Sequence, residues 1–301
     1  MRRNYRDVNG ILLLDKPVGL TSNRALQTVK RIFNARKAGH TGSLDPLASG
    51  LLPLCFGHAT KASHWLLDAD KTYEVTASIG AQTDTADAEG AIVATAEVAE
   101  VSESALQQAI AEHLGEIEQV PPMYSALKHE GRRLYELARA GEKVDRAPRK
   151  IRIYAIEIVK FDPRHPVLRV RCSKGTYIRT LVETVAEAMG TLAHVQTLRR
   201  TELGPFDAGR MVTLAQIEDL ASDVAALDSL LIPADSALKQ FSAVTLSATE
   251  AHYLLNGNPV GHAAKGIEGL VRVYDKQQGF LGVGEVLPDG RIAPKRLFLS
   301  G

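Results

Sequence analysis

Asp45 is the residue whose surroundings in this sequence best suit chemistry. It lies in the stretch AGHTGSLDPLASGLLPL, residues 38–54, which is otherwise small or apolar. Gly39 and Gly42 allow the backbone to approach a ligand closely, and Pro46 stiffens the step after the carboxylate. A carboxylate in such a setting is a candidate nucleophile or general base. The alternative, which is more common for a turn aspartate, is that it only accepts hydrogen bonds from loop amides.

Three other side chains are candidates, each with a structural alternative that the residues alone leave open. Lys16, in DKPVGLTS, precedes a predicted helix, where it could bind a phosphate or simply lie in solvent. Tyr73 begins a predicted strand, where a core position is the commoner case. Arg179 lies off the apolar stripe of a predicted helix, so it could balance a buried carboxylate or face water.

A metal site is the other chemistry to consider near Asp45, because His40, His58 and His64 lie close to it in the sequence. They form neither an HxH nor an HxxxH pair, and no cysteine lies at ligand spacing, so the sequence predicts no metal site. No cofactor motif is visible either. The two cysteines, Cys55 and Cys172, are predicted to be buried free thiols in a reducing cytosol.

The charged residues are segregated along the chain, although the net charge is only +1. Residues 1–40 hold nine Lys/Arg and two Asp/Glu, and residues 128–179 hold fifteen Lys/Arg and six Asp/Glu. Residues 72–127, between these blocks, hold ten Asp/Glu and no Lys or Arg. This pattern indicates a polyanion bound by the basic blocks, or else charged faces that average out in the fold.

The composition is that of a globular protein, with 45% hydrophobic and 24% charged residues among 301. The apolar runs are too short for a transmembrane helix, and Asp15-Lys16-Pro17 interrupts the first of them, so we predict neither a membrane span nor a signal peptide. We therefore expect a cytoplasmic protein.

Strands and helices alternate irregularly in the predicted order. We expect strands over residues 11–15, 71–80, 149–159 and 166–175, and helices over 22–33, 59–70, 102–115, 134–140, 176–190 and 214–231. Residues 82–101 are predicted to be turn and loop. Because several strands adjoin without a helix between them, an α+β fold with a mixed sheet is favoured over a doubly wound parallel one.

A domain boundary is predicted near residues 233–243. A short helix over 247–257 follows it, with a capping box of Ser247 and Glu250, and then short strands over 269–275, 279–287 and 291–299. We expect two domains, 1–235 and 236–301, the second a compact β-barrel-like appendage.

Six motifs in this order resemble the bacterial TruB family, the synthases that make pseudouridine at position 55 of tRNA. They are LLLDKPVGLTS, GHTGSLDPLASGLLPL, KTYEVTASIGAQTDTADAEG, PPMYSALKHEGRRLYELAR, CSKGTYIRTL and LRRTELGPF, and they span residues 11–206. The closing segment resembles the PUA-type RNA-binding domain. The resemblance implies a catalytic domain with a mixed, largely antiparallel sheet flanked by helices, followed by a small PUA-like β-barrel.

The resemblance also implies a catalytic group of three residues. Asp45 is the catalytic aspartate, and Arg179 pairs with it. Tyr73 packs on the target uracil and is implicated in the proton transfers. Burial alone would raise the pKa of Asp45, and we expect the arginine to oppose that shift and keep the carboxylate charged.

Four more residues are implied in binding the substrate. His40 occupies the space that the flipped nucleotide leaves, Tyr177 and Leu198 line the uridine pocket, and Lys16 supports the active-site loop. No metal or cofactor is implied.

The expected partner is the T-arm of tRNA, held through its backbone by a dense basic run. The members of this run are Arg132, Arg133, Arg139, Lys143, Arg146, Arg149 and Lys150. We expect the C-terminal domain to touch another part of the tRNA. We predict a monomer with no obligate protein partner.

Overall fold

The computed structural model describes residues 5–96, 101–261, 266–277 and 279–298. One large sheet runs through the molecule. Its strand order is β13-β1-β3-β12-β4-β11-β10-β7, and β2 is paired to β3. Its strands are β1 (Gly10–Lys16), β2 (Ala38–His40), β3 (Ser49–Phe56), β4 (Lys71–Ile79), β7 (Gly115–Gln119), β10 (Arg149–Lys160), β11 (Val167–Cys172), β12 (Ala193–Leu203) and β13 (Val212–Thr213).

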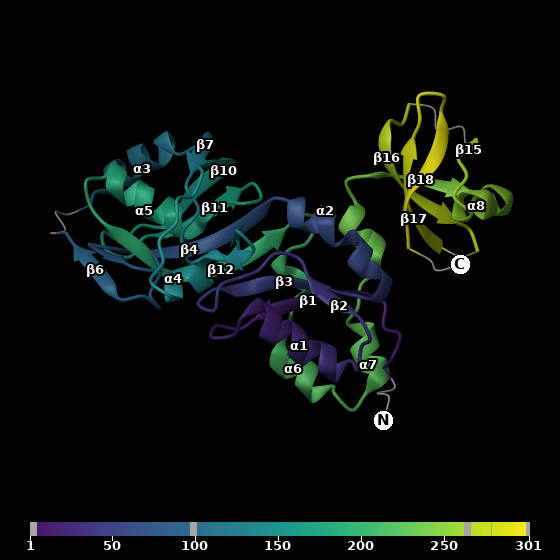
Figure 1. Ribbon diagram of the computed structural model, residues 1–301, viewed down its shortest axis with the longest axis horizontal. Helices are drawn as coiled ribbons and strands as arrows, with labels where there is room; N and C mark the ends of the chain where they lie inside the picture. The colour runs from purple at the N-terminus through teal and green to yellow at the C-terminus, as the bar shows by residue number, and fades with distance from the viewer. Residues whose placement is uncertain (1–4, 97–100, 262–265, 278, 299–301) are drawn as a thin grey trace.

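The sheet is mixed and mostly antiparallel, which confirms the predicted α+β class. Only β1–β13 and β12–β3 pair in parallel. The helices near this sheet are α1 (Ser22–Ile32), α2 (Ser63–Asp68), α3 (Glu103–Glu112), α4 (Leu134–Arg139), α5 (Ile178–Ala188), α6 (Leu214–Asp219) and α7 (Val224–Ser229). In Figure 1, α3 and α5 lie together over the β7–β10 end, and α1 lies beside α6 below β1.

Helix α1 shows how the local sequence fixes an element next to the candidate site. Thr21 is its N-cap, and its side chain accepts a hydrogen bond from the backbone N–H of Arg24. Ala25, Leu26 and Val29 recur at helical spacing and are buried in the main core. The first turn of the helix is therefore anchored where the loop carrying Asp45 passes.

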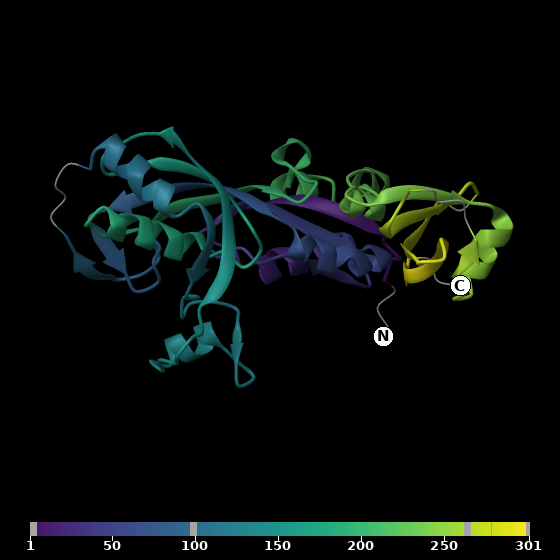
Figure 2. The same cartoon turned by 90° about the horizontal axis from the view of Figure 1, so that it is seen from above.

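The C-terminal unit is a second sheet, with the strand order β14-β16-β17-β18-β15, curled into a half-barrel. Its elements are β14 (Ser242–Leu246), α8 (Ala248–Leu255), β15 (Val260–Gly261), β16 (Gly269–Asp275), β17 (Gly279–Val286) and β18 (Arg291–Leu297). This unit stands at one end of an elongated molecule, next to α2 (Figures 1 and 2). Buried Val283 and Phe298 share a hydrophobic cluster with Leu66 and Leu203 of the large unit, which joins the two parts.

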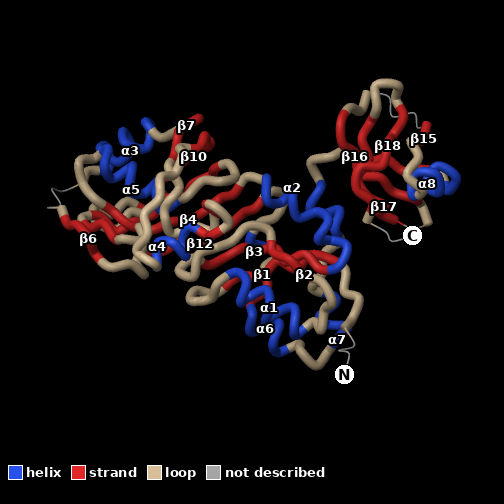
Figure 3. The backbone as a smooth tube through the Cα atoms, viewed as in Figure 1, coloured by secondary structure: helices blue, strands red, loops and turns tan. Residues whose placement is uncertain are grey.

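The structure departs from the expected elements in strands that were not predicted and in helices that are interrupted; Figure 3 colours strands and helices separately. The predicted loop 82–101 contains a hairpin, β5 (Ala81–Thr83) and β6 (Ile92–Thr95), while residues 97–100 lie outside the described part. The predicted helix 214–231 is two helices, because Asp223 caps a new one with its side chain. The predicted helix 59–70 begins as a 3₁₀ helix, Gly57–Ala62, before α2.

Several elements were not predicted at all. Besides β2, β3, β7, β12, β13, β14 and β15, these are β8 (Lys128–His129) and β9 (Arg132–Arg133), and the 3₁₀ helices Ala208–Arg210 and Ala234–Leu238. The two strands β8 and β9 pair only with one another and precede α4. Together they form an insertion over residues 123–143, which projects from one face of the molecule in Figure 2. Most of these elements are too short to show a hydrophobic period.

The backbone of β3 passes close to Arg200 of β12 at Gly50, and we expect Gly50→Ala to destabilise the fold. Its φ is +97°, and an added Cβ would lie 2.3 Å from the carbonyl oxygen of Arg200. Gly190 provides the control, because its φ is +74° and nothing lies within 4 Å of an added Cβ. Urea denaturation should show a loss of about 1–2 kcal/mol for Gly190→Ala, from the left-handed backbone alone. The loss for Gly50→Ala should be about 3–5 kcal/mol. Equal losses would contradict the backbone clash.

Candidate active site

A cleft of about 710 Å³ opens between the large sheet and the projecting insertion. Its walls come from segments far apart in the sequence: the start of α1, the loop 40–46, the turn 85–89, and residues 124–126 and 133–139 of the insertion. Asp45 and Arg179 both line it. The volume is within the range of small-molecule and nucleotide sites.

The loop that carries Asp45 is fixed on both sides by hydrogen bonds. The hydroxyl of buried Ser22 accepts from the N–H of Leu44 at 2.7 Å and donates to the carbonyl of Leu44 at 3.0 Å. The N–H of Gly19 donates to the carbonyl of Pro46 at 2.8 Å. The aspartate is therefore held between two anchored neighbours.

Arg179 holds the Asp45 carboxylate with a charged hydrogen bond. Its Nε lies 3.0 Å from Oδ2 of Asp45, and only 5% of the arginine side chain is exposed. Its Nη1 donates to the carbonyl of Thr85 at 2.8 Å, and its Nη2 donates to the carbonyl of Tyr124 at 2.7 Å. Every nitrogen of the guanidinium has a partner, so the planar group is fixed and so is the carboxylate that it contacts.

Asp87 is a second carboxylate beside Arg179, and sequence reasoning did not identify it. Its Oδ2 lies 3.9 Å from Nη1 of Arg179, and 5% of its side chain is exposed. Its Oδ1 accepts from the hydroxyl of Thr85 at 2.6 Å and from the N–H of Glu89 at 3.1 Å. The signal available in the sequence was the turn DTADAEG, which indicated a turn and not a buried carboxylate. One guanidinium thus lies between two carboxylates.

The electrostatic setting of Asp45 is more open than the sequence indicated. We expected a carboxylate inside an apolar pocket, but 42% of its side chain is exposed, because it faces the cleft. The protein packed around the loop still raises its pKa, while Arg179 opposes the rise and Asp87 adds to it. The arginine therefore acts on the pKa of Asp45 in the direction expected from the sequence.

The other predicted site residues take different positions around the cleft. His40, at the end of β2, lines it, and its Nδ1 is buried without a hydrogen-bond partner. Tyr73 on β4, Tyr177 before α5 and Leu198 on β12 are not among the described residues that line the cleft. Tyr73 is only 9% exposed, and burial raises the pKa of its phenol, an effect that the nearby Arg200 opposes.

Lys16 is not placed to bind substrate, nor does it lie in solvent. It has no exposed surface, and its Nζ donates to the carbonyls of Pro17 at 2.8 Å and Leu20 at 2.7 Å. A third, longer bond of 3.5 Å reaches the carbonyl of Pro46, next to Asp45. The lysine is therefore a positioning residue for the active-site loop. Its contacts agree with the expectation that it supports this loop.

Lys16 also predicts a specific dependence of stability on pH. Burial lowers its pKa from 10.5 to about 8, although Asp45 opposes the shift. Between these two values the unfolded chain binds a proton that the folded chain does not, so stability rises with pH across this window. We compare the free energy of unfolding of the wild type with that of Lys16→Met. Between pH 8 and pH 10.5 we expect the value of the wild type to rise, relative to that of the variant, by up to about 3 kcal/mol. Urea titrations of both proteins measure it, and a constant difference would contradict the lowered pKa.

Arg200 is a further buried residue that the sequence analysis did not select. Only 1% of it is exposed, and its Nε donates to the carbonyl of Leu51 at 2.7 Å. Its Nη2 donates to the carbonyl of Gly42 at 3.1 Å, which fixes the glycine-rich end of the Asp45 loop. Burial of His40 lowers its pKa, and the charge of Arg200 lowers it further.

Some residues of the predicted basic run line the cleft, and others form ion pairs with glutamates. Arg133 and Arg139 line the cleft, together with Tyr135. Arg132 pairs with Glu142 at 3.0 Å, and Lys150 pairs with Glu116 at 2.9 Å. The insertion thus presents cations and an aromatic ring to whatever enters the cleft.

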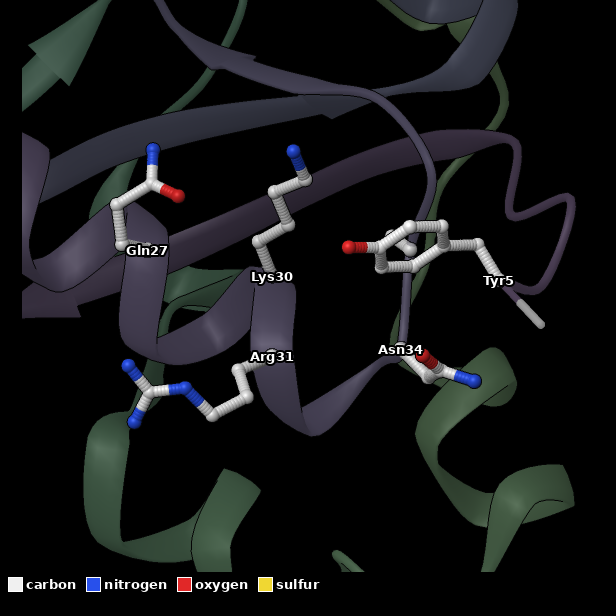
Figure 4. A pocket seen from close by; sticks show the side chains of 6 residues that line it. Tyr5, Gln27, Lys30, Arg31 and Asn34 are labelled. Carbon is white, nitrogen blue, oxygen red and sulfur yellow. The ribbon is translucent and has the colours of Figure 1, made fainter. Parts of the chain in front are cut away.

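A smaller cavity of about 310 Å³ lies at the other end of α1. Tyr5, Gln27, Lys30, Arg31 and Asn34 surround it, as Figure 4 shows. No carboxylate is among its described lining residues. Asp45 and Arg179 line the larger cleft and not this cavity, so the larger cleft is the candidate active site.

Comparison with family models covers nearly the whole chain. Residues 30–178 match the TruB family pseudouridylate synthase N-terminal domain. Residues 179–239 match the tRNA pseudouridylate synthase B C-terminal domain, and residues 242–298 match the C-terminal domain of pseudouridine synthase II TruB.

Curated relatives are similar over their full length. tRNA pseudouridine synthase B of Stutzerimonas stutzeri is 52% identical, over 100% of this chain and 99% of that protein. The protein of the same name from Pseudomonas aeruginosa is 50% identical, with the same coverage. That from Yersinia pestis is 47% identical, over 99% of this chain and 95% of that protein.

Solved structures agree with the fold. A chain in the crystal structure of a Cbf5–Nop10–Gar1 complex has a TM-score of 0.75 and 26% identity, covering 96% of this chain and 85% of that chain. A chain of the archaeal box H/ACA sRNP Nop10–Cbf5 complex has a TM-score of 0.73 and 24% identity, covering 97% of this chain and 87% of that one. With a carboxylate–guanidinium pair in a nucleotide-sized cleft, and with family models and relatives matching from end to end, the chain belongs to the TruB family of pseudouridine synthases.

Proposed function

We propose that this chain isomerises the T-loop uridine at position 55 of tRNA to pseudouridine. The observation that carries the proposal is the Asp45–Arg179 pair, 3.0 Å apart, at the wall of a cleft of about 710 Å³. The family match supplies the reaction class. The relatives named tRNA pseudouridine synthase B, at about half identity over full length, support tRNA as the substrate.

The reaction breaks the bond between N1 of the base and C1′ of the ribose and joins C1′ to C5. The target base must first leave the RNA stack, which costs a few kcal/mol. Asp45 then acts on the nucleotide as an ionised carboxylate. Burial raises its pKa, and the guanidinium of Arg179, 3.0 Å away, favours the charged form. The fixed guanidinium keeps the carboxylate aimed while the base turns.

Atoms balance in this reaction without a co-reactant. C5 loses a proton once it has joined C1′, and N1, freed from the sugar, gains one. Burial raises the pKa of Tyr73, so its phenol is protonated at neutral pH and suits a proton relay better than a base. We assign Tyr73, Tyr177 and Leu198 to the inner surface that the everted uracil contacts, beyond the mouth formed by the lining residues.

His40 and the insertion complete the proposed RNA site. His40 lines the cleft, so we assign its ring to the contact with the RNA at the position that the flipped nucleotide leaves. Arg133 and Arg139 are placed to meet phosphates, and the ring of Tyr135 to stack on a base. Specificity would follow from the shape of the loop and its splayed bases.

The remaining expectations concern the whole molecule. No described helix is long and apolar enough to cross a membrane. We propose a monomeric protein that acts where tRNA matures, in the cytoplasm, without an obligate protein partner. We also propose a boundary after residue 235, with 1–235 catalytic and 236–301 binding RNA outside the T-loop.

The test is incubation of an unmodified tRNA transcript with the purified protein and no added cofactor. Pseudouridine mapping should then detect conversion at a single T-loop uridine. A tRNA in which that uridine is replaced by cytidine is the control and should show none. Absence of conversion with folded protein and folded RNA would reject the proposal, and conversion of a uridine outside the T-loop would reject the assigned position.

A further inference from the structure

The junction between the two units contains a cleft that the active site does not use. Its volume is about 450 Å³, and it is lined by Lys61 and by residues 294–297 of β18. Lys61 belongs to the 3₁₀ helix before α2, and its Nζ donates to the carbonyl of Leu297 at 2.9 Å. Figure 1 shows α2 and the C-terminal sheet side by side at this point. The cleft therefore exists only while the two units are docked.

Three cations, Lys37, Lys61 and Arg296, lie at or beside this cleft. Lys61 and Arg296 line the same cleft. Lys37 lies beside the 3₁₀ helix that carries Lys61, because its carbonyl accepts from the N–H of Gly57, the first residue of that helix, at 3.0 Å. In keeping with this arrangement, burial lowers the pKa of Lys61, and the charges of Arg296 and Lys37 lower it further. Within the described part of the chain, no ion pair to a carboxylate involves Lys37, Lys61 or Arg296. Lys295, next to Arg296 and also on the cleft, is paired with Glu285 at 2.8 Å.

We propose that Lys37, Lys61 and Arg296 bind a backbone phosphate of the substrate RNA outside its T-arm. The inference rests on the proposed function and names a contact that it does not require. Uncompensated like charges held together by the fold repel one another, and an anion between them removes that cost. Phosphate suits the set, because it accepts from ammonium and guanidinium groups together.

The shape of the molecule favours RNA over a small free anion. In Figure 2 the insertion beside the catalytic cleft and the C-terminal unit lie far apart along the long axis. An RNA bound by its T-loop at the catalytic cleft has to extend well beyond that loop to reach the junction. A folded tRNA provides such a length of duplex, with phosphates along its surface.

The experiment compares the double variant Lys37→Gln/Arg296→Gln with Lys295→Gln. The double variant keeps the bond between Lys61 and Leu297, so the two units stay docked. Lys295→Gln removes one positive charge from the same cleft, but one that is already paired. Binding of an unmodified tRNA is measured over a range of salt concentrations, beside binding of an isolated T-arm hairpin, and conversion is measured at saturating RNA.

We expect the double variant to bind tRNA about 10-fold more weakly, with a slope of log K against log salt smaller by about 1 to 2. The T-arm hairpin should bind equally to all variants, and conversion at saturating tRNA should be unchanged. A tRNA affinity and slope equal to those of Lys295→Gln would overturn the inference. An equal loss with the hairpin would overturn it too, since it would place the effect at the catalytic cleft.

These outcomes are distinct from failure of the proposed function. If the wild type converts no uridine in either RNA, the function is wrong. If the wild type converts the T-loop uridine but the double variant binds tRNA as tightly as wild type, only the phosphate site is wrong. Inorganic phosphate should inhibit tRNA binding by the wild type more strongly than tRNA binding by the double variant. Equal inhibition of the two proteins would also count against the phosphate site.

Discussion

Replacing Asp45 with asparagine should abolish pseudouridine formation while tRNA remains bound. Asparagine has nearly the same shape, so the loop held by Ser22 and Gly19 should keep its conformation. It carries no charge, however, and is neither a nucleophile nor a base. Loss of such a group lowers the rate by about 10⁴-fold or more in enzymes where it acts covalently. Single-turnover conversion of a tRNA transcript measures the loss, and equilibrium binding measures what remains.

The same variant separates an enzyme from a protein that only folds or carries RNA. An RNA chaperone would use the same basic surfaces and would be indifferent to one amide in the cleft. Ser43→Ala, at another residue lining the cleft, is the matched control and should keep near-wild-type turnover. Turnover within 10-fold of wild type for Asp45→Asn would remove the carboxylate from the mechanism.

Part of the fold could be predicted from the sequence, because several of its longer elements carry a clear hydrophobic period. The central strands β3 and β12 are long and were nevertheless not predicted. The alternation in residues 166–172 and the apolar stripe of α5 both predicted the observed strand and helix. The two-residue strands of the insertion and the break at Asp223 could not be predicted. Such short segments are stabilised by tertiary contacts and by local caps, and those leave no period in the sequence.

The candidate site shows a similar division. Asp45 could be selected because an aspartate between glycines and apolar residues is unusual, and Arg179 through the motif around it. Asp87 could not, since its burial depends on the turn 85–89 folding against α5. The residues around Lys16 left open whether it binds a phosphate or lies in solvent, for a related reason. The sequence shows a lysine before a helix, and only the fold shows that three carbonyls surround its ammonium group.

The second large effect that we expect is on the pH dependence of the reaction, and it distinguishes the two neighbours of Asp45. The carboxylate must be ionised to act, so activity falls as the pH drops through its pKa. Arg179 lowers that pKa and Asp87 raises it. Weakening the arginine should therefore move the acid limb of the profile to higher pH, and removing the charge of Asp87 should move it to lower pH.

Arg179→Lys and Asp87→Asn test these opposite shifts. Lysine keeps the charge but cannot make the three contacts of the guanidinium, so the carbonyls of Thr85 and Tyr124 lose their donors. We expect a rate loss of about 100-fold or more, because a lysine no longer fixes the Asp45 carboxylate and a misplacement of about 1 Å costs about 100-fold in rate. Asparagine at 87 still accepts from Thr85 and Glu89, so its rate loss should be smaller. Single-turnover rates from pH 5 to pH 9 measure the acid limb of the profile for each variant. If the two variants move the acid limb in the same direction, Arg179 does not act by keeping Asp45 charged, and its contribution would have to be the geometry of the cleft alone.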